Sequence, residues 1–181
     1  MKTWGDVKKA VLDKLFMTED EARQQNYSEK FMYLANECLT MIANDVKANV
    51  KSFEITTTAE NQKVTFPSDF ISYANLVNYR NNIPDPEIIF VDYNTVILPE
   101  IGSYIIFYNA NWETIVNETQ ELKIDKSVLM CLPSYIASQV LSQDDIQRST
   151  ILRNEFELFI SRLDTTTMYQ QNHYRSEGGW Y

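Results

Sequence analysis

The stretch QRSTILRNEFELFISRLD, residues 147–164, decides the fold because its apolar side chains recur at helical spacing. Four of them stand four, three and four residues apart, and side chains at these spacings share one face of an α-helix; they are Leu152, Phe156, Phe159 and Leu163. The stretch therefore predicts a strongly amphipathic helix that packs against a core with one face.

The residues before this stretch also favour a helix. In IDKSVLMCLPSYIASQVLSQDD, residues 124–145, a connected apolar face is formed by Val128, Leu132, Tyr135, Ile136 and Val140. Pro133 has no backbone N–H to donate, so it must lie in the first turn of a helix or kink the helix. The C-terminal part of the chain therefore predicts two helices.

Two more helices are expected near the N-terminus. Thr3, with Asp6 three residues later, is typical of a capped helix start, and apolar residues follow at helical spacing. A second start at Ser28 precedes a helix of about 20 residues, whose apolar face is formed by Phe31, Leu34, Ala35, Cys38, Ile42 and Val46. The segment MTEDEARQQN, residues 17–26, is interpreted as a linker between the two helices.

Between the helical regions the apolar pattern changes to a period of two, which predicts short strands from about Ser52 to Trp112. The alternating groups are Phe53/Ile55, Val64/Phe66, Ile71/Tyr73, Ile88/Phe90 and Tyr104/Ile106/Tyr108. The runs EIIFV, VIL and YIIFY are continuously apolar, which indicates strands covered on both faces. We therefore expect the β-region to pack against the helices or a neighbouring subunit.

These patterns predict an α+β fold that is mainly helical: a small helix bundle, a β-rich insertion and an extended C-terminal tail. The bundle should consist of two N-terminal and two C-terminal helices, in residues 1–51 and 121–164. The insertion should occupy residues 52–120 and the tail residues 165–181.

The tail, TTTMYQQNHYRSEGGWY, places four aromatic residues among amides and two adjacent glycines, so it cannot form a core by itself. Aromatic residues and arginine are the usual anchors of protein interfaces. We therefore expect the tail to dock on a partner, through Tyr169, His173, Tyr174, Arg175, Trp180 and Tyr181.

The residue chemistry points away from catalysis. His173 is the only histidine, which excludes a histidine triad or a two-histidine metal site, and neither GxxxxGK[ST] nor GxGxxG occurs. The carboxylate pairs, Asp144/Asp145 and Glu155/Glu157, are typical of solvated positions. We expect no enzyme activity, cofactor or metal, although a small hydrolase that uses surface carboxylates stays a remote alternative. Cys38 and Cys131 lack CxxC spacing and are expected to be buried free thiols.

The charge of −9 and pI of about 4.6 argue against a nucleic-acid-binding protein, because the cationic footprint that neutralises phosphates is missing. The amphipathic N-terminus is not typical of a secretory signal, and the apolar runs are far shorter than the ~20 residues of a membrane span. We expect a cytosolic protein or a component of a soluble assembly.

Four stretches, together with the order of the predicted elements, resemble the head-to-tail connector proteins of tailed bacteriophages, the portal adaptor or head-completion family. They are WGDVKKAVL (4–12), FMYLANECLTMIANDVK (31–47), FPSDFISYANLVNYR (66–80) and LPSYIASQVLSQDDIQRSTILRNEFELFISRLDTT (132–166). The resemblance is one of pattern over residues 3–165. It carries over no catalytic residue, because these adaptors have none.

The resemblance implies a structural protein of the virion neck, present in the host cytoplasm during assembly. Such adaptors form rings of about 12 copies, bind beneath the portal protein, and meet a stopper, nozzle or other tail component below. Genomic DNA passes through the ring without specific binding, and an acidic lumen is compatible with that. The alternative is a monomeric protein- or peptide-binding module that uses the β-rich region.

Overall fold

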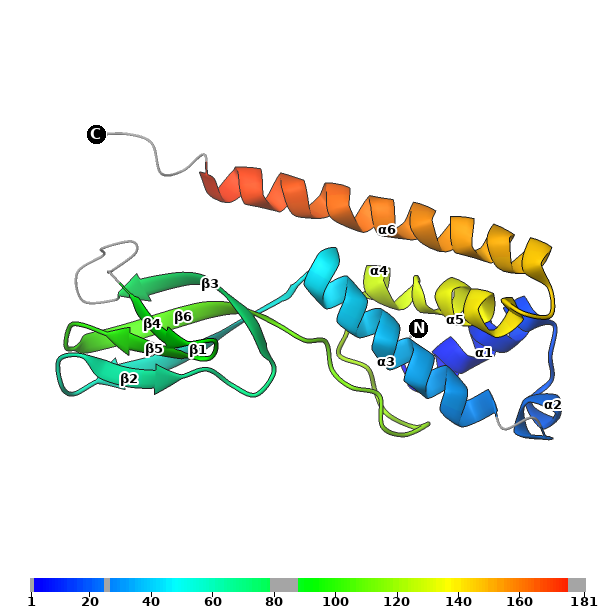
Figure 1. Ribbon diagram of the computed structural model, residues 1–181, viewed down its shortest axis with the longest axis horizontal. Helices are drawn as coiled ribbons and strands as arrows, with labels where there is room; N and C mark the ends of the chain where they lie inside the picture. The colour runs from blue at the N-terminus through cyan, green and yellow to red at the C-terminus, as the bar shows by residue number, and fades with distance from the viewer. Residues whose placement is uncertain (1, 25–26, 79–87, 176–181) are drawn as a thin grey trace. The chain divides into compact units, whose positions relative to one another are not determined.

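The computed structural model describes residues 2–24, 27–78 and 88–175 of the chain (Figure 1). Contacts divide the chain into two compact units. The helical unit contains Met1–Lys47 and Trp112–Tyr181, and the β-unit contains Ala48–Asn111. The β-unit is thus an insertion between two halves of the helical unit.

The helical unit is built around one central helix. Its helices are α1 (Trp4–Leu15), α2 (Glu19–Gln24), α3 (Tyr27–Asp45), α4 (Lys126–Leu129), α5 (Leu132–Leu141) and α6 (Ile146–Arg175). Helix α5 contacts α1, α3 and α6, and its residues Leu132, Ile136 and Ala137 are fully buried. Both ends of the chain are therefore needed to complete this core.

The predicted helix start at Thr3 and the predicted helix boundary at Pro133 are confirmed, whereas the start predicted at Ser28 lies one residue inside α3, which begins at Tyr27. The Thr3 hydroxyl accepts a hydrogen bond from Asp6 N–H, and the Asp6 carboxylate accepts one from Thr3 N–H, which forms a capping box. Pro133 lies in the first turn of α5, so the helical region is divided into α4 and α5, and α5 itself is not kinked. On α6, Leu152, Phe156 and Leu163 are buried, as their spacing predicts.

The segment interpreted as a linker contains a helix, α2. The hydroxyl of Thr18 accepts a hydrogen bond from Glu21 N–H, and the Glu21 carboxylate accepts hydrogen bonds from the Thr18 N–H and hydroxyl. This Thr-x-x-Glu pattern satisfies the free N–H groups of a first turn. The linker prediction was wrong because the acidic composition concealed this capping box.

The prediction of a mainly helical fold with an extended tail is also wrong. About 47% of the chain is helix and about 25% is strand, and the strands form two three-stranded antiparallel sheets. Helix α6 continues to Arg175, so residues 165–175 are helical. The physical reason is that no proline or glycine follows Asp164 until Gly178, and nothing earlier in the tail forces the helix to stop. Residues 176–181 lie outside the described part of the chain.

The β-unit consists of two small sheets around an aromatic core. Its strands are β1 (Asn49–Thr57), β2 (Gln62–Thr65), β3 (Phe70–Asn78), β4 (Ile89–Asp92), β5 (Thr95–Leu98) and β6 (Gly102–Ala110). One sheet has the order β1-β6-β3 and the other β2-β5-β4. The core is formed by Val64, Phe66, Val96, Leu98, Tyr104, Ile106, Tyr108 and Ala110.

The strands do not have both faces buried, contrary to the expectation from their apolar runs. In β6, buried residues alternate with half-buried ones, and β5 follows the same pattern. Strand β4 is exposed along its whole length. The expectation was wrong because both sheets are antiparallel and share one core, so one face of each strand lies outside that core.

Candidate docking surfaces

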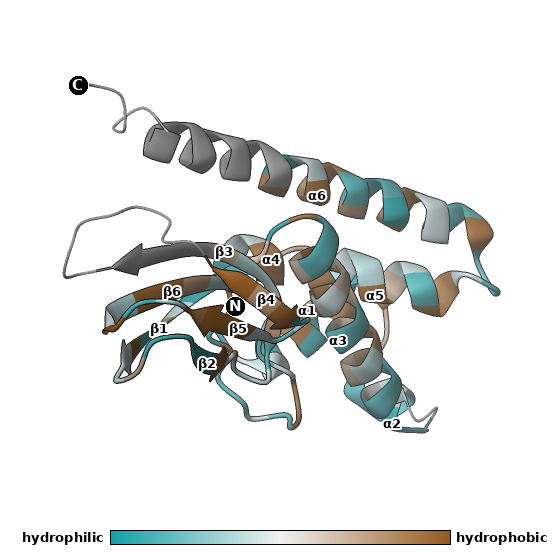
Figure 2. Ribbon diagram, turned by 60° about the vertical axis from the view of Figure 1, so that its left-hand side comes forward, coloured by the Kyte–Doolittle hydropathy of each residue, from teal (hydrophilic) through white to brown (hydrophobic). Residues whose placement is uncertain are grey.

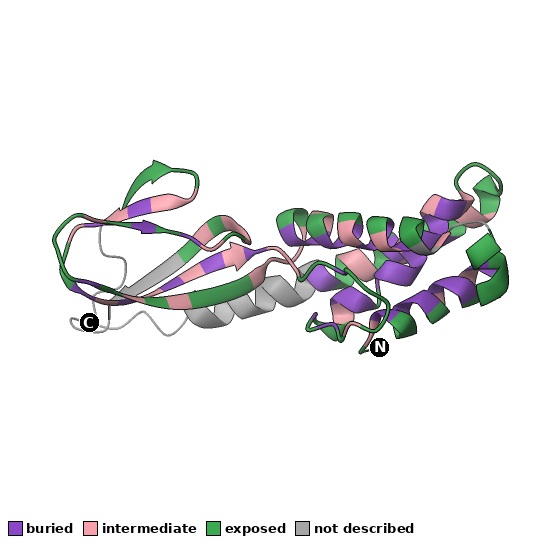
Figure 3. Ribbon diagram, turned by 90° about the horizontal axis from the view of Figure 1, so that it is seen from below, coloured by how far each residue is buried: buried purple, intermediate pink, exposed green. Residues whose placement is uncertain are grey.

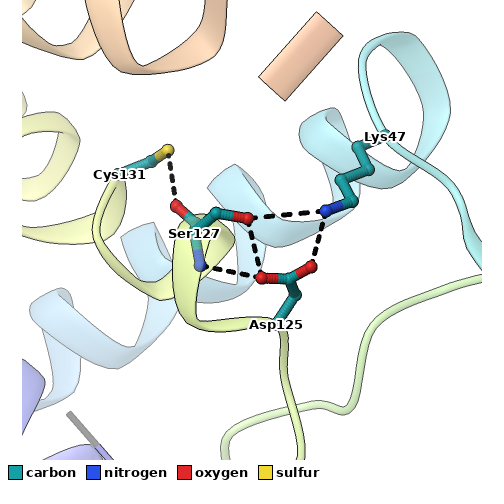
Figure 4. Close-up of polar contacts among 4 residues, drawn as sticks. All are labelled: Lys47, Asp125, Ser127 and Cys131. Atoms are coloured by element: carbon teal, nitrogen blue, oxygen red, sulfur yellow. Dashed lines mark hydrogen bonds and ion pairs between the residues drawn. The ribbon is translucent and has the colours of Figure 1, made fainter. Parts of the chain in front are cut away.

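A polar cluster lies beside the point where the chain leaves the helical unit (Figure 4). Lys47 Nζ lies 2.5 Å from Asp125 Oδ2, and the other oxygen of Asp125 accepts hydrogen bonds from the N–H and the hydroxyl of Ser127. The Cys131 thiol donates to the Ser127 carbonyl oxygen at 3.4 Å. The cluster brings together a lysine, a serine, a carboxylate and a thiol, which are the residue types of a nucleophilic site.

The geometry of the cluster indicates a structural role rather than a nucleophilic site. Asp125 is the N-cap of α4, and its hydrogen bonds with Ser127 are those of a helix start. Burial raises the pKa of the Cys131 thiol to about 12, and it also raises the pKa of the Cys38 thiol, so neither is a thiolate at neutral pH. Both cysteines are free and buried, which confirms the prediction for them. The ion pair fixes Lys47 to the start of α4.

This ion pair should make stability depend on pH. Desolvation alone would raise the pKa of the Asp125 carboxyl, but hydrogen bonds from Lys47 and Ser127 outweigh it and lower the pKa to about 2, from 3.8. The charged form is therefore favoured in the folded state. Its contribution is present above about pH 4 and is lost as the pH falls toward 2.

We expect Asp125→Asn to lower the free energy of unfolding at pH 7 by about 1 kcal/mol, because the carboxylate is partly exposed and solvent screens the pair. The difference between wild type and variant should shrink at pH 3, as measured by urea unfolding. The control is Glu54→Gln, an exposed carboxylate on β1 that forms no ion pair with a described residue. A difference for Asp125→Asn that is the same at both pH values would contradict the assignment.

The helical unit exposes several large apolar side chains. Figure 3 colours the ribbon by how far each residue is buried. On α6, Ile151 is 67% exposed and Leu158 is 62% exposed. These two residues are seven positions apart and therefore share one face of the helix, away from the face that Leu152 and Phe156 bury. We call Ile151 and Leu158 the outer stripe of α6. Exposed apolar side chains on one face of a helix can contribute to packing against a partner.

A further exposed aromatic residue lies where α1 ends. Phe16 is 84% exposed and has φ 55°, in the left-handed region that is unfavourable for a residue with a Cβ. The guanidinium of Arg148, in the first turns of α6, lies 4.0 Å from the centre of the Phe16 ring, and it donates a hydrogen bond to the Lys14 carbonyl oxygen. Arg148 thus holds an exposed aromatic ring at the junction of α1 and α6.

In the β-unit, the exposed apolar residues gather on strand β4, which Figure 2 colours as apolar together with β5. Ile89, Phe90 and Val91 are 52%, 50% and 47% exposed, and Tyr93, just after the strand, is 81% exposed. Strand β4 is hydrogen-bonded only to β5 within its sheet. The apolar run EIIFV predicted a buried strand at this position, whereas the structure shows an exposed one.

The structure places the predicted docking residues only in part. The backbones of Tyr169, His173, Tyr174 and Arg175 belong to the last turns of α6, while Trp180 and Tyr181 lie outside the described residues. The sequence missed the outer stripe of α6, although Ile151 and Leu158 could have been found as a second face of the same helical pattern.

Two negative findings apply to the described residues. No group of three or more histidine, cysteine, aspartate or glutamate side chains is arranged to hold a metal ion within the described ranges. No helix in this part of the chain is long and apolar enough to span a membrane.

Comparison with known proteins adds no identification. The chain matches no protein-family model, and it matches no curated protein.

Proposed function

We propose that this protein is a structural, non-enzymatic component of a phage neck, an adaptor that forms a ring beneath the portal protein. In this role it joins the capsid to the tail through a stopper, nozzle or other tail component. DNA passes through the ring and is not bound specifically. The proposal rests on the resemblance in sequence pattern and on the surfaces described above.

The observation that carries the proposal is the construction of α6. One face of this helix closes the core through Leu152, Phe156 and Leu163, while the outer stripe, Ile151 and Leu158, is exposed. A subunit of a ring must present apolar surface to its neighbours in addition to its own core. The outer stripe supplies such a surface on a rigid element.

The length of α6 supports attachment to a second protein. The helix has 30 residues, which corresponds to about 45 Å at ~1.5 Å per residue. It continues twelve residues beyond Leu163, which is buried. Those residues include Tyr169, His173, Tyr174 and Arg175, which we propose as part of the portal-docking segment. An amphipathic helix that enters a groove is a common mode of protein recognition.

The alternative, a monomeric peptide-binding module, is favoured by one observation. Strand β4 lies at the edge of its sheet and exposes apolar side chains, which is how proteins that add a peptide strand to a sheet present their binding edge. This reading does not account for the outer stripe of α6.

Light scattering of the free protein and of its mixture with the portal protein of the same virus tests the proposal. We expect the free chain to be mainly monomeric at micromolar concentration, since single contacts between copies are weak and become effective only when the portal holds the copies side by side. With portal present, the chain should move into one large complex. The proposal would be contradicted by a free chain that already forms a stable closed ring, or by a chain that does not bind the portal protein.

A further inference from the structure

Among the described residues, the sheet β2-β5-β4 has an unpaired strand edge on each side, and the two edges differ in chemistry. Strand β2 forms one edge and carries Lys63, which is exposed and forms no ion pair with a described residue. Strand β4 forms the other edge and ends in Asp92, which accepts a hydrogen bond from the Asn94 N–H and also forms no ion pair with a described residue. One edge therefore offers a cation and the other an anion.

The pairing within the sheet shows which side chains lie in line. Lys63 pairs with Ile97 on β5, and Ile97 pairs with Ile89 on β4, so these three form a row on one face. The neighbouring row, on the opposite face, is Val64, Val96 and Phe90. Val64 and Val96 are buried, and the Phe90 ring contacts Tyr73 edge to face at 5.7 Å. Lys63, Ile97 and Ile89 therefore lie on the outer face of the sheet.

Natural edge strands are usually protected by charge, proline, bulges or short length. Strand β4 has only four residues and a register shift between Phe90 and Asp92, but its exposed residues Ile89, Phe90 and Val91 carry no charge. A strand of this kind can pair with another strand, although a pair of so few residues is weak. Weak contacts of this kind become effective when they repeat around a closed ring.

We propose that β4 of one copy pairs with β2 of the next copy, so that the three-stranded sheets join edge to edge around the ring. This inference rests on the proposed ring. Strands β2 and β4 run in the same direction, because each is antiparallel to β5. A small rotation between neighbouring copies keeps that direction, so β4 and the neighbour's β2 pair in parallel, about 4.8 Å apart.

The joined sheet explains the residues at both edges. The row of Lys63, Ile97 and Ile89 continues into Lys63 of the next copy, whose aliphatic stem covers the exposed Ile89. The ammonium group of that lysine then reaches Asp92, one step along the same face. One contact between copies thus covers the apolar edge of β4 and pairs Lys63 with Asp92.

Cysteine cross-linking tests this pairing without the portal. The single variants Ile89→Cys and Lys63→Cys, mixed at millimolar concentration under oxidising conditions, should form a disulfide-linked dimer that contains one chain of each. Each variant alone should stay monomeric, because the same residue of two copies does not meet. The native cysteines are buried and should not react.

The matched control is Val50→Cys mixed with Lys63→Cys, since Val50 is 62% exposed on β1, an edge strand of the other sheet. We expect the Ile89 and Lys63 mixture to give about ten-fold or more cross-linked dimer than this control, because the contact raises the local thiol concentration. All three positions are exposed, so circular dichroism should show unchanged folds.

Three outcomes would overturn the inference. The first is a yield of cross-linked dimer no higher than in the control. The second is a dimer of Ile89→Cys alone, which indicates symmetric β4 pairing, and the third is loss of the cross-link when an excess of unrelated extended peptide is added, which indicates a peptide-binding edge. The proposed function is tested separately. Cross-linking without portal binding would support the edge pairing and contradict the adaptor role. Portal binding without cross-linking would support the adaptor role and contradict the edge pairing.

Discussion

A chain that ends at Asp164 should keep its fold and lose the proposed attachment to the portal. Deletion of residues 165–181 keeps the buried face of α6 from Leu152 to Leu163. The melting temperature should therefore change little. Each buried aromatic anchor of an interface contributes about 2 kcal/mol or more, and a ring multiplies the loss of several anchors.

The measurement is complementation of a deletion phage with the shortened chain, followed by a count of portal-bound copies. A second chain that ends at Arg175 is the matched control, because it keeps all of α6 and removes only residues 176–181, including Trp180 and Tyr181. We expect this control to lose part of the attachment. Normal, infectious necks with the chain that ends at Asp164 would show that the docking segment is dispensable.

The second large effect is expected from Trp4→Ala. Trp4 is 1% exposed and lies at the start of α1. Its backbone N–H donates a hydrogen bond to the Gln120 carbonyl oxygen at 3.1 Å. Leu122 N–H donates to the Lys2 carbonyl oxygen at 2.8 Å, so this region ties the two halves of the helical unit together. Truncation of a buried tryptophan should lower the free energy of unfolding by about 3 to 5 kcal/mol.

Urea unfolding followed by far-ultraviolet circular dichroism measures this loss. If Trp4→Ala does not fold, Trp4→Phe should show a smaller loss, because it leaves a smaller cavity. The control is Val116→Ala, which is 69% exposed and should change stability by about 0.5 kcal/mol at most. A Trp4→Ala variant as stable as the wild type would mean that α1 does not close the core.

The sequence was most informative where one residue type has one physical meaning. The spacing of Leu152, Phe156 and Leu163 requires a helix with a buried face, and Pro133 requires a helix start or a kink. The Thr3 and Asp6 pair requires a capped start. These features are local, so they can be recognised without knowledge of the rest of the fold.

The errors come from features that depend on neighbours. Residues 165–175 contain threonines, which are weak helix formers, and aromatics, so the composition pointed to a tail; the helix continues because nothing in that stretch breaks it. The apolar run that contains Ile89 and Phe90 predicted a covered strand. Burial of a strand depends on what packs against each of its faces, which the sequence of one strand does not contain.

The candidate site could be predicted only in part for the same reason. The docking residues of the C-terminal segment were chosen from composition, and Trp180 and Tyr181 lie outside the described residues. The outer stripe of α6 and the edge of β4 emerge only when the buried residues are known, because they are the apolar residues that the core does not use.

The most direct test of the adaptor role is a subunit count by native mass spectrometry of the protein mixed with purified virion necks or portal rings. The account predicts one discrete mass increase that corresponds to a full ring of about 12 copies, with few partly filled complexes, because neighbouring copies support one another. A single bound copy, a broad distribution of independent copies, or no binding would contradict the claim that this protein is a ring-forming adaptor.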